Sequence, residues 1–156
     1  IDPDGALALC YESGRWVDYC RHDVNGEIAQ VDLDHALRNR DRLEGDILRQ
    51  KTCYHGIGKY VGRISTEEGF AACQRVDLGP QNLFRENCVH GVGWAGAEQM
   101  AEKFAADCSR AGDQQDSCLL GVAYNLKRHK PLVGIEICDS VERNDLRSDC
   151  LAFLNR

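Results

Sequence analysis

Cysteine and histidine occur two residues apart at three places in the chain. The segments are CRHD (20–23), CYHGIG (53–58) and CVHGVG (88–93). Thiolate sulfur and imidazole nitrogen are ligands of both Cu and Zn, so this pattern is a candidate metal site. If neighbouring helices carry these segments about 8 to 10 Å apart, their imidazoles could reach a shared ion. The candidate metal ligands are His22, His55, His90 and Cys53.

Other interpretations of these side chains need no metal. An inward-facing histidine can bond to a backbone carbonyl, and a lone thiol can be buried as a small apolar group. A haem or another cofactor is a third interpretation, but the segments lack Cys-x-x-Cys-His, the pattern of covalent haem attachment. We favour structural histidines, expect no resident cofactor, and keep Cu or Zn binding as the alternative.

Cys53 and His55 also have the residue types of a nucleophile and its base. Two positions apart on a helix, their side chains diverge by about 200°, so these two alone do not form a catalytic pair. The chain has 25 Asp and Glu residues, but no pair of them has a spacing or setting that indicates acid–base hydrolysis. We therefore expect no catalytic residues and a protein that is not an enzyme.

Glycines follow these segments at fixed positions. They are Gly56 and Gly58, then Gly91 and Gly93, with Gly121 at the corresponding place in a later segment. A glycine inside a helix costs about 1 kcal/mol relative to alanine. Close approach of a neighbouring helix is the favoured compensation for that cost. A kink, or a ligand pressed against the backbone, is the alternative.

The cysteines fall into two alternating sets, and this repeat organises the whole chain. One set recurs every 30 to 35 residues: Cys20, Cys53, Cys88, Cys118 and Cys150. The other set follows small or apolar residues: Cys10, Cys73, Cys108 and Cys138. The step from the first set to the second is 20 residues in three cases, with two helical patterns and a break between them. Each unit is therefore predicted to be a helical hairpin.

Cap and break signals place the helices of these hairpins. Ser65 and Glu68 have the spacing of a capping box, and Pro131 suits the first turn of a helix. No convincing alternation indicates a strand. When the units are aligned on their cysteines, Leu120 and Ala152 take the histidine position in the last two, which indicates an inward-facing register. The predicted helices cover residues 4–13, 15–30, 32–43, 45–63, 65–77, 81–95, 97–110, 114–128, 131–142 and 144–155.

Two pairing schemes are compatible with the spacing of the nine cysteines. In the first scheme, each bond crosses the turn between one hairpin and the next. The pairs are then Cys10–Cys20, Cys73–Cys88, Cys108–Cys118 and Cys138–Cys150. Only Cys53 is left unpaired. In the second scheme, each bond lies within a hairpin, Cys20 meets Arg40 at the expected partner position, and Cys10 and Cys150 also lack partners. The first scheme is favoured because it leaves fewer cysteines unpaired.

The segment FAADCSRAGDQQDSCLLGVAY (104–124) has a cysteine on either side of a short turn, followed by Leu-Gly-x-x-Tyr. It resembles secreted cysteine-rich helical-repeat proteins related to tetratricopeptide arrays, and the resemblance covers mainly residues 70–155. The resemblance implies a right-handed αα-solenoid that binds a protein or peptide, and it carries over no catalytic residues. We expect an all-α fold, an αα-hairpin solenoid of about four repeats in a single domain over residues 1–156.

Composition limits the functional classes. At 156 residues and 43% apolar content, the chain has the size of one domain with its own core. The net charge of −6 argues against nucleic-acid binding, which needs a basic face. Nine cysteines without a Cys-x-x-Cys pair indicate disulfides, and hence a periplasmic or secreted protein. The chain begins at Ile1 without Met, so we expect that a signal segment has been removed, and no apolar run of about 20 residues predicts a membrane span.

Aromatic residues gather near the first helix of each hairpin: Tyr11, Trp16, Tyr19, Tyr54, Tyr60, Trp94 and Tyr124. Most are expected in the core. Any that share the concave side with Lys59, Arg63 and Lys127 would be rigid anchors for a partner. The favoured function is an extracytoplasmic binding or scaffold protein that recognises a partner protein or peptide, with an accessory subunit of a larger assembly as one form of it. The alternative is a periplasmic protein that binds Cu or Zn. The sequence indicates neither the partner's identity nor an oligomeric state.

Overall fold

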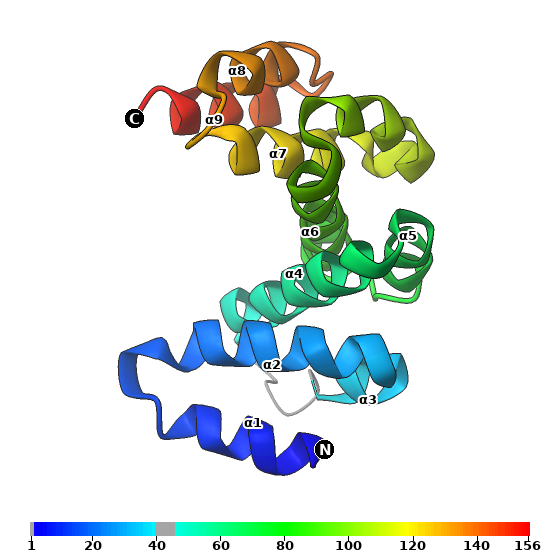
Figure 1. Cartoon of the computed structure of the whole chain (residues 1–156), viewed down its shortest axis with the longest axis vertical. Coiled ribbons are helices and arrows are strands. Elements are labelled where there is room, and N and C mark those ends of the chain that lie inside the picture. The colour runs from blue at the N-terminus through cyan, green and yellow to red at the C-terminus, as the bar shows by residue number, and fades with distance from the viewer. Residues whose placement is uncertain (1, 40–45) are drawn as a thin grey trace.

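Helices form all the regular secondary structure that the computed structural model describes, which covers residues 2–39 and 46–156 (Figure 1). The described α-helices are α1 (Pro3–Tyr11), α2 (Val17–Val31), α3 (Leu33–Arg38), α4 (Ile47–Ile64), α5 (Thr66–Gln74), α6 (Leu83–Met100), α7 (Gln115–Leu126), α8 (Pro131–Asp139) and α9 (Asn144–Leu154). The described 3₁₀ helices are η1 (Gly14–Trp16), η3 (Pro80–Asn82) and η4 (Ala101–Gln114). The predicted all-α class is therefore confirmed for these residues. None of these helices combines the length and the apolar character needed to cross a lipid bilayer.

Side chains at the helix starts explain several of the boundaries. The carboxylate of Asp46 accepts a hydrogen bond from the Arg49 amide at 3.0 Å and caps α4. The Ser65 hydroxyl accepts one from the Glu68 amide at 3.3 Å, so the predicted start of α5 is confirmed. Pro131 occupies the first turn of α8, as predicted. Proline lacks an amide hydrogen, and an amide in the first turn of a helix has no hydrogen-bond acceptor within the helix, so proline is tolerated there.

One predicted helix boundary is wrong. The sequence predicts separate helices at 81–95 and 97–110, but α6 continues through Gly96 to its end at Met100. A Cβ atom at Gly96 would overlap with the ring of Phe104. Glycine at this position of α6 therefore makes room for that ring. The segment that follows is the 3₁₀ helix η4 and not the predicted α-helix.

Most of the other predicted helices agree with the observed ones. The helices α1, α2, α4, α5, α7, α8 and α9 begin and end within three residues of their predicted positions. The helix predicted at 32–43 is observed as α3, which ends at Arg38. Its last predicted residues, 40–43, lie outside the described residues. The period of the apolar residues was therefore a sound guide to where helices occur.

The helices pack in the order of the sequence. α2, α4, α6 and α7 contact one another in succession; α1 and α3 pack on α2, α5 packs on α4 and α6, and α8 and α9 pack on α7. Figure 1 shows the two ends of this stack, α1–α2 and α7–α9, extending to the same side of α4 and α6. The buried apolar side chains form one continuous cluster that runs from Leu7 to Leu154.

Four disulfides join neighbouring elements of the described chain. They are Cys10–Cys20, Cys73–Cys88, Cys108–Cys118 and Cys138–Cys150, with Cα–Cα distances of 5.4 to 5.6 Å. Each bond crosses a turn between one predicted hairpin and the next, which confirms the first pairing scheme and excludes the second. Cys53 carries a free thiol and is buried, as that scheme predicted.

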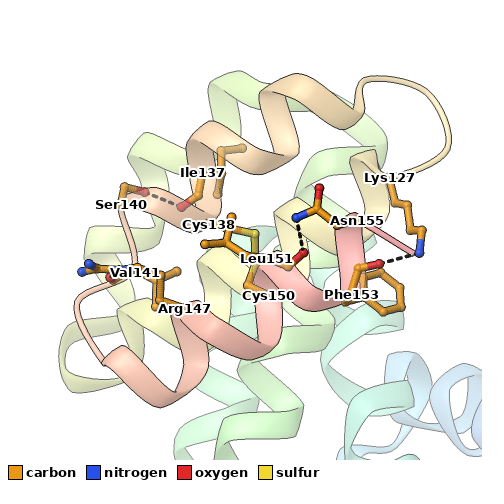
Figure 2. Close-up of a disulfide and its surroundings, with 10 residues drawn as sticks. All are labelled: Lys127, Ile137, Cys138, Ser140, Val141, Arg147, Cys150, Leu151, Phe153 and Asn155. Atoms are coloured by element: carbon orange, nitrogen blue, oxygen red, sulfur yellow. Dashed lines mark hydrogen bonds between the residues drawn. A yellow bond between two sulfur atoms is a disulfide. The ribbon is translucent and has the colours of Figure 1, made fainter.

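Hydrogen bonds hold the turn beside the last disulfide, which links α8 to α9 (Figure 2). The Ser140 hydroxyl donates to the carbonyl of Ile137 at 2.7 Å. Arg147 donates from Nε to the carbonyl of Val141, also at 2.7 Å, and the side chain of Val141 is fully buried. The end of the stack is therefore held by a covalent bond, two hydrogen bonds and an apolar contact.

Candidate functional site

Glycine contacts set how closely the helices of the Cys-x-His segments approach. The same contact repeats between a glycine and the histidine carbonyl of the preceding helix: Gly56 with His22, Gly91 with His55, and Gly121 with His90. A second set of contacts involves cysteine carbonyls of the following helix: Gly58 with Cys88, and Gly93 with Cys118. A Cβ atom at any of these glycines would overlap with the carbonyl oxygen. The glycines are therefore explained by helix packing, as favoured from the sequence.

This close packing brings the three histidine rings into a column across α2, α4 and α6. The ring centres of His22 and His55 are 5.1 Å apart, and those of His55 and His90 are also 5.1 Å apart. His22 Nε2 and His55 Nδ1 form a hydrogen bond of 2.8 Å. On its other nitrogen, His22 bonds to the carboxylate of Asp23 at 2.7 Å. Three of the four predicted metal ligands therefore lie together.

The hydrogen bonds fix where the protons lie on these rings. An ionised carboxylate only accepts, so Asp23 takes a hydrogen bond from the Nδ1–H of His22. The Nε2 atom of a neutral His22 then accepts from the Nδ1–H of His55. At the other end of the column, Nδ1 of His90 is buried and has no hydrogen-bond partner among the described residues. The row of three histidines therefore begins with a ring that is hydrogen-bonded to Asp23 and ends with an unpartnered nitrogen on His90.

The environment keeps the imidazoles neutral at pH 7. Burial lowers the pKa of His22, although the hydrogen bond and charge of Asp23 oppose the shift. Burial, helped by the two neighbouring histidines, lowers the pKa of His55 well below its usual value. Burial and the charge of Lys51 lower the pKa of His90 to about 4. Burial also acts to raise the pKa of Asp23, but its hydrogen bonds outweigh that effect and lower the pKa, so this carboxyl stays ionised.

Two further rings extend the column toward the C-terminus. The Tyr124 ring lies edge-on to His90 with ring centres 5.3 Å apart, and the Phe153 ring stacks on Tyr124 with centres 4.0 Å apart. We call His22, His55, His90, Tyr124 and Phe153 the ring column. Burial, together with the charge of Asp149, raises the pKa of Tyr124.

The last two members of the ring column are not at the positions predicted from the alignment of cysteines. Leu120 is buried, as expected, but the ring that meets His90 belongs to Tyr124, one helical turn later. Ala152 is exposed on α9, so its predicted inward register is wrong. Sequence reasoning missed Phe153. Its neighbour in the column, Tyr124, could have been predicted from the sequence. Tyr124 follows Cys118 at the same spacing as Trp94 follows Cys88, so the two aromatic residues occupy equivalent positions in their repeats.

Trp94 and a group of charged side chains flank the ring column. The Trp94 ring centre is 6.1 Å from that of His55 and 6.4 Å from that of His90. Its indole N–H donates to Glu98 at 3.0 Å, and Glu98 also pairs with Arg63 at 2.8 Å. The ammonium group of Lys59 lies 5.7 Å from the Trp94 ring centre. Some predicted anchors, both aromatic and cationic, therefore do gather beside the histidines.

Other aromatic residues named from the sequence lie elsewhere. Tyr54 is buried in the core, where its ring centre is 5.2 Å from that of Phe84. Tyr11 and Trp16 are exposed near the N-terminal end of the described chain. The core interpretation is therefore right for Tyr54, but these residues at the N-terminal end belong neither to the core nor to the ring column.

Two hollows border the ring column and share Trp94. The smaller one, of about 430 Å³, lies beside the histidines and is lined by His22, Asp23, His55, Asn87, Trp94 and other residues. The larger one, of about 620 Å³, lies between α6, α7 and the end of α9 and is lined by Trp94, Glu98, Tyr124, Lys127, Arg128, Phe153 and other residues. Volumes of this size can take small molecules or parts of a peptide.

Lys127 stands at the edge of the larger hollow and holds the end of α9. Its ammonium group donates to the carbonyl of Phe153 at 2.5 Å and lies 4.1 Å from the centre of the Phe153 ring (Figure 2). A cation over an aromatic face is attracted by the ring's negative face. The residue predicted as a cationic anchor is thus adjacent to the ring column.

Comparison of the chain with models of protein families, curated proteins and solved structures found no match. The interpretation of the site therefore depends on its geometry. Its parts are the ring column, the two hollows beside it and the cations at their edges.

The fourth predicted metal ligand, Cys53, belongs to a different environment. The charged groups that act on its thiol are Arg21 and Asp18. Burial raises the pKa of Cys53 to about 11, so the thiolate form that binds metals or attacks substrates is scarce at pH 7. Within residues 2–39 and 46–156, no group of three or more His, Cys, Asp or Glu side chains is arranged to hold a metal ion.

Proposed function

We propose that this protein is an extracytoplasmic αα-solenoid that binds a segment of a partner protein or peptide along the ring column. The observation that carries the proposal is the ring column itself: α2, α4, α6, α7 and α9 each contribute one ring, and two hollows border it. A surface to which each successive module contributes is how helical-repeat proteins hold extended partners.

The packing of the helices supports the solenoid part of the proposal. Each long helix contacts the next one along the chain, and the glycine contacts at the Cys-x-His segments repeat from α2 to α7. Each disulfide ties one hairpin to its neighbour. In a repeat array, stability depends on these nearest-neighbour interfaces. The resemblance of residues 104–124 to cysteine-rich helical repeats agrees with this arrangement.

The disulfides support the proposed location. Four bonds within one chain of this size are consistent with an oxidising environment outside the cytoplasm, such as a periplasm or the cell exterior. A binding protein in such a compartment can also be an accessory subunit of a larger assembly.

The chemistry of the side chains favours binding over catalysis. Cys53 is 5% exposed, and its raised pKa leaves it a poor nucleophile. The rings of Trp94, Tyr124 and Phe153 are flat surfaces with few rotatable bonds, which lose little entropy when a partner covers them. We therefore propose that the rings act as anchors and that no bond is made or broken.

Site-specific photo-cross-linking tests the proposal. A benzophenone amino acid is placed at Tyr124 in one variant and at Leu132 in a control variant, and both are exposed to the extracytoplasmic fraction of the source organism. Leu132 is 74% exposed on α8 and lines neither hollow. We expect a discrete cross-linked polypeptide from the Tyr124 variant alone. No adduct, or the same adducts from both positions, would contradict the proposal.

A second candidate function is binding of one Cu ion by His22 and His55. Their facing nitrogens are 2.8 Å apart, which gives an angle of about 90° if each metal–nitrogen bond is about 2.0 Å. That angle suits tetragonal Cu(II) better than tetrahedral Zn. The hydrogen bond from His22 to Asp23 is the type of support that ligating histidines usually have. Cys53 takes no part in this candidate site.

Titration with Cu(II), followed by electron paramagnetic resonance, tests this second candidate. We expect a single bound ion whose spectrum carries the splitting of two nitrogen ligands, and we expect its loss in a His55→Gln variant. His129→Gln is the control, because His129 is exposed after the end of α7 and is not one of the ring-column residues. Equal copper binding by both variants, or a spectrum without nitrogen splitting, would remove the candidate.

A further inference from the structure

We infer that the segment occupying the larger hollow is an acidic stretch of a partner polypeptide, with an apolar side chain next to its carboxylates. This inference rests on the proposed function and names the chemistry of the partner. The argument concerns which charges around the hollow already have partners within the chain and which do not.

Some of the charges at the hollow are already neutralised. Glu98 pairs with Arg63 at 2.8 Å and accepts a hydrogen bond from Trp94, so it is not available to a cationic ligand. Lys130 pairs with Glu102 at 2.8 Å. These pairs leave little net charge of their own at the hollow.

Two cations at the hollow have no carboxylate partner among the described residues. Lys127 is half-buried, and its ammonium group contacts the Phe153 carbonyl and ring but forms no ion pair in the described chain. Arg128, the next residue, is exposed and likewise forms no ion pair with any described residue. The chain as a whole has a net charge of −6, so this local excess of positive charge is not a general property of its surface. The positive charge of Lys127 and Arg128 is complementary to carboxylates on a partner.

The rings supply the second half of the recognition. Tyr124 and Phe153 stack at 4.0 Å and line the hollow together with Trp94. An apolar or aromatic side chain placed against them is removed from water while the adjacent carboxylates lie near Lys127 and Arg128. A hollow of about 620 Å³ is large enough for such a pair of neighbouring side chains. The two contacts together require a segment in which acidic and apolar residues alternate or adjoin.

Selection from a display library of random peptides tests this inference. The library is selected on the wild-type protein, on a Lys127→Gln/Arg128→Gln variant, and on an Arg15→Gln/Arg38→Gln control with the same change of net charge at the other end of the stack. Because Lys127 also holds the end of α9, Arg128→Gln alone is included as a variant that removes no bond between described residues.

We expect peptides selected on the wild type to be rich in Asp and Glu beside Phe, Leu or Trp. Their synthetic forms should bind about tenfold more weakly to the double variant, should weaken to a smaller extent with Arg128→Gln, and should bind the control as they bind the wild type. Selected peptides without an excess of acidic residues, or equal binding to all variants, would overturn the inference and leave the proposed function standing. Failure to select any peptide would count against both.

Discussion

The sharpest test of how the fold is held together is the substitution Gly58→Ala in α4. A Cβ atom built at Gly58 overlaps with the Cys88 carbonyl oxygen and comes within 2.7 Å of the carbonyl carbon and 3.2 Å of Cα. These are backbone atoms of α6, and Cys88 is tied to Cys73 by a disulfide, so they have little freedom to move away. The methyl group must therefore push α4 and α6 apart.

The size of the effect comes from two opposing terms. Replacing a helical glycine with alanine stabilises the helix by about 1 kcal/mol. Forcing an extra carbon into a packed interface costs about 1 to 3 kcal/mol, and the upper end applies because backbone atoms are in the way. We therefore expect the free energy of unfolding to fall by about 2 kcal/mol. For a protein of this size, that corresponds to a decrease in Tm of about 4 to 8 °C.

Gly62→Ala is the matched control, on the same helix and one turn later. Its Cβ atom would lie 3.3 Å from Val92 Cα and 3.4 Å from Ala95 Cβ, so small movements accommodate it. The same gain in helix propensity should leave the stability of this variant within about 1 kcal/mol of the wild type. The contrast between the two variants isolates the contact between the helices.

Urea denaturation followed by far-ultraviolet circular dichroism, with the disulfides intact, measures both variants. Tryptophan fluorescence reports in addition on the ring column, because Trp94 is one of the two tryptophans and separation of α4 from α6 changes the surroundings of its indole. If Gly58→Ala is as stable as Gly62→Ala, close helix contact is not the reason for glycine at this position, and the account of the column's geometry fails with it.

Three further predictions concern charge and covalent bonds. The pKa of His90 is about 4 in the folded protein and about 6.5 in the unfolded chain. As the pH drops, the unfolded chain therefore takes up the proton first, and the free energy of unfolding should fall between about pH 6.5 and pH 4. Urea titrations at several pH values should show a loss of about 3 kcal/mol from this residue that is absent in His90→Gln; equal slopes would contradict it. The Cys53 thiol should react with a disulfide reagent only after unfolding, giving one equivalent, and fast reaction of the folded protein would show that it is accessible. Replacing Cys10 and Cys20 together with Ser opens a short loop and should lower the unfolding free energy by about 2 to 4 kcal/mol, measured by urea denaturation, whereas an unchanged midpoint would mean that the loop adds no constraint.

Many features of the fold could be predicted from the sequence because they depend on near neighbours in the chain. Apolar residues at helical spacing, the cap at Ser65 and the proline at Pro131 act within one or two helical turns, and each indicated a helix that is observed. The sequence also favoured the observed pairing of the cysteines, because that scheme left fewer cysteines unpaired, but the structure was needed to exclude the second scheme. The boundary between the helices predicted at 81–95 and 97–110 is wrong, because Gly96 lies inside α6 and leaves space there for Phe104.

The ring column is a product of the tertiary structure. Three of its members were visible as a repeat, but whether His22, His55 and His90 would touch depended on how closely their helices approach. That distance is determined by glycine–carbonyl contacts between residues 25 or more positions apart. The same packing brings Tyr124 and Phe153 into the column and leaves Cys53 beside Arg21 and Asp18. The sequence by itself determined where most of the helices lie and favoured one pattern of covalent links. Only the packing of one helix on the next decided which side chains share a face, because a side chain's neighbours on another helix depend on the register and separation of the two helices.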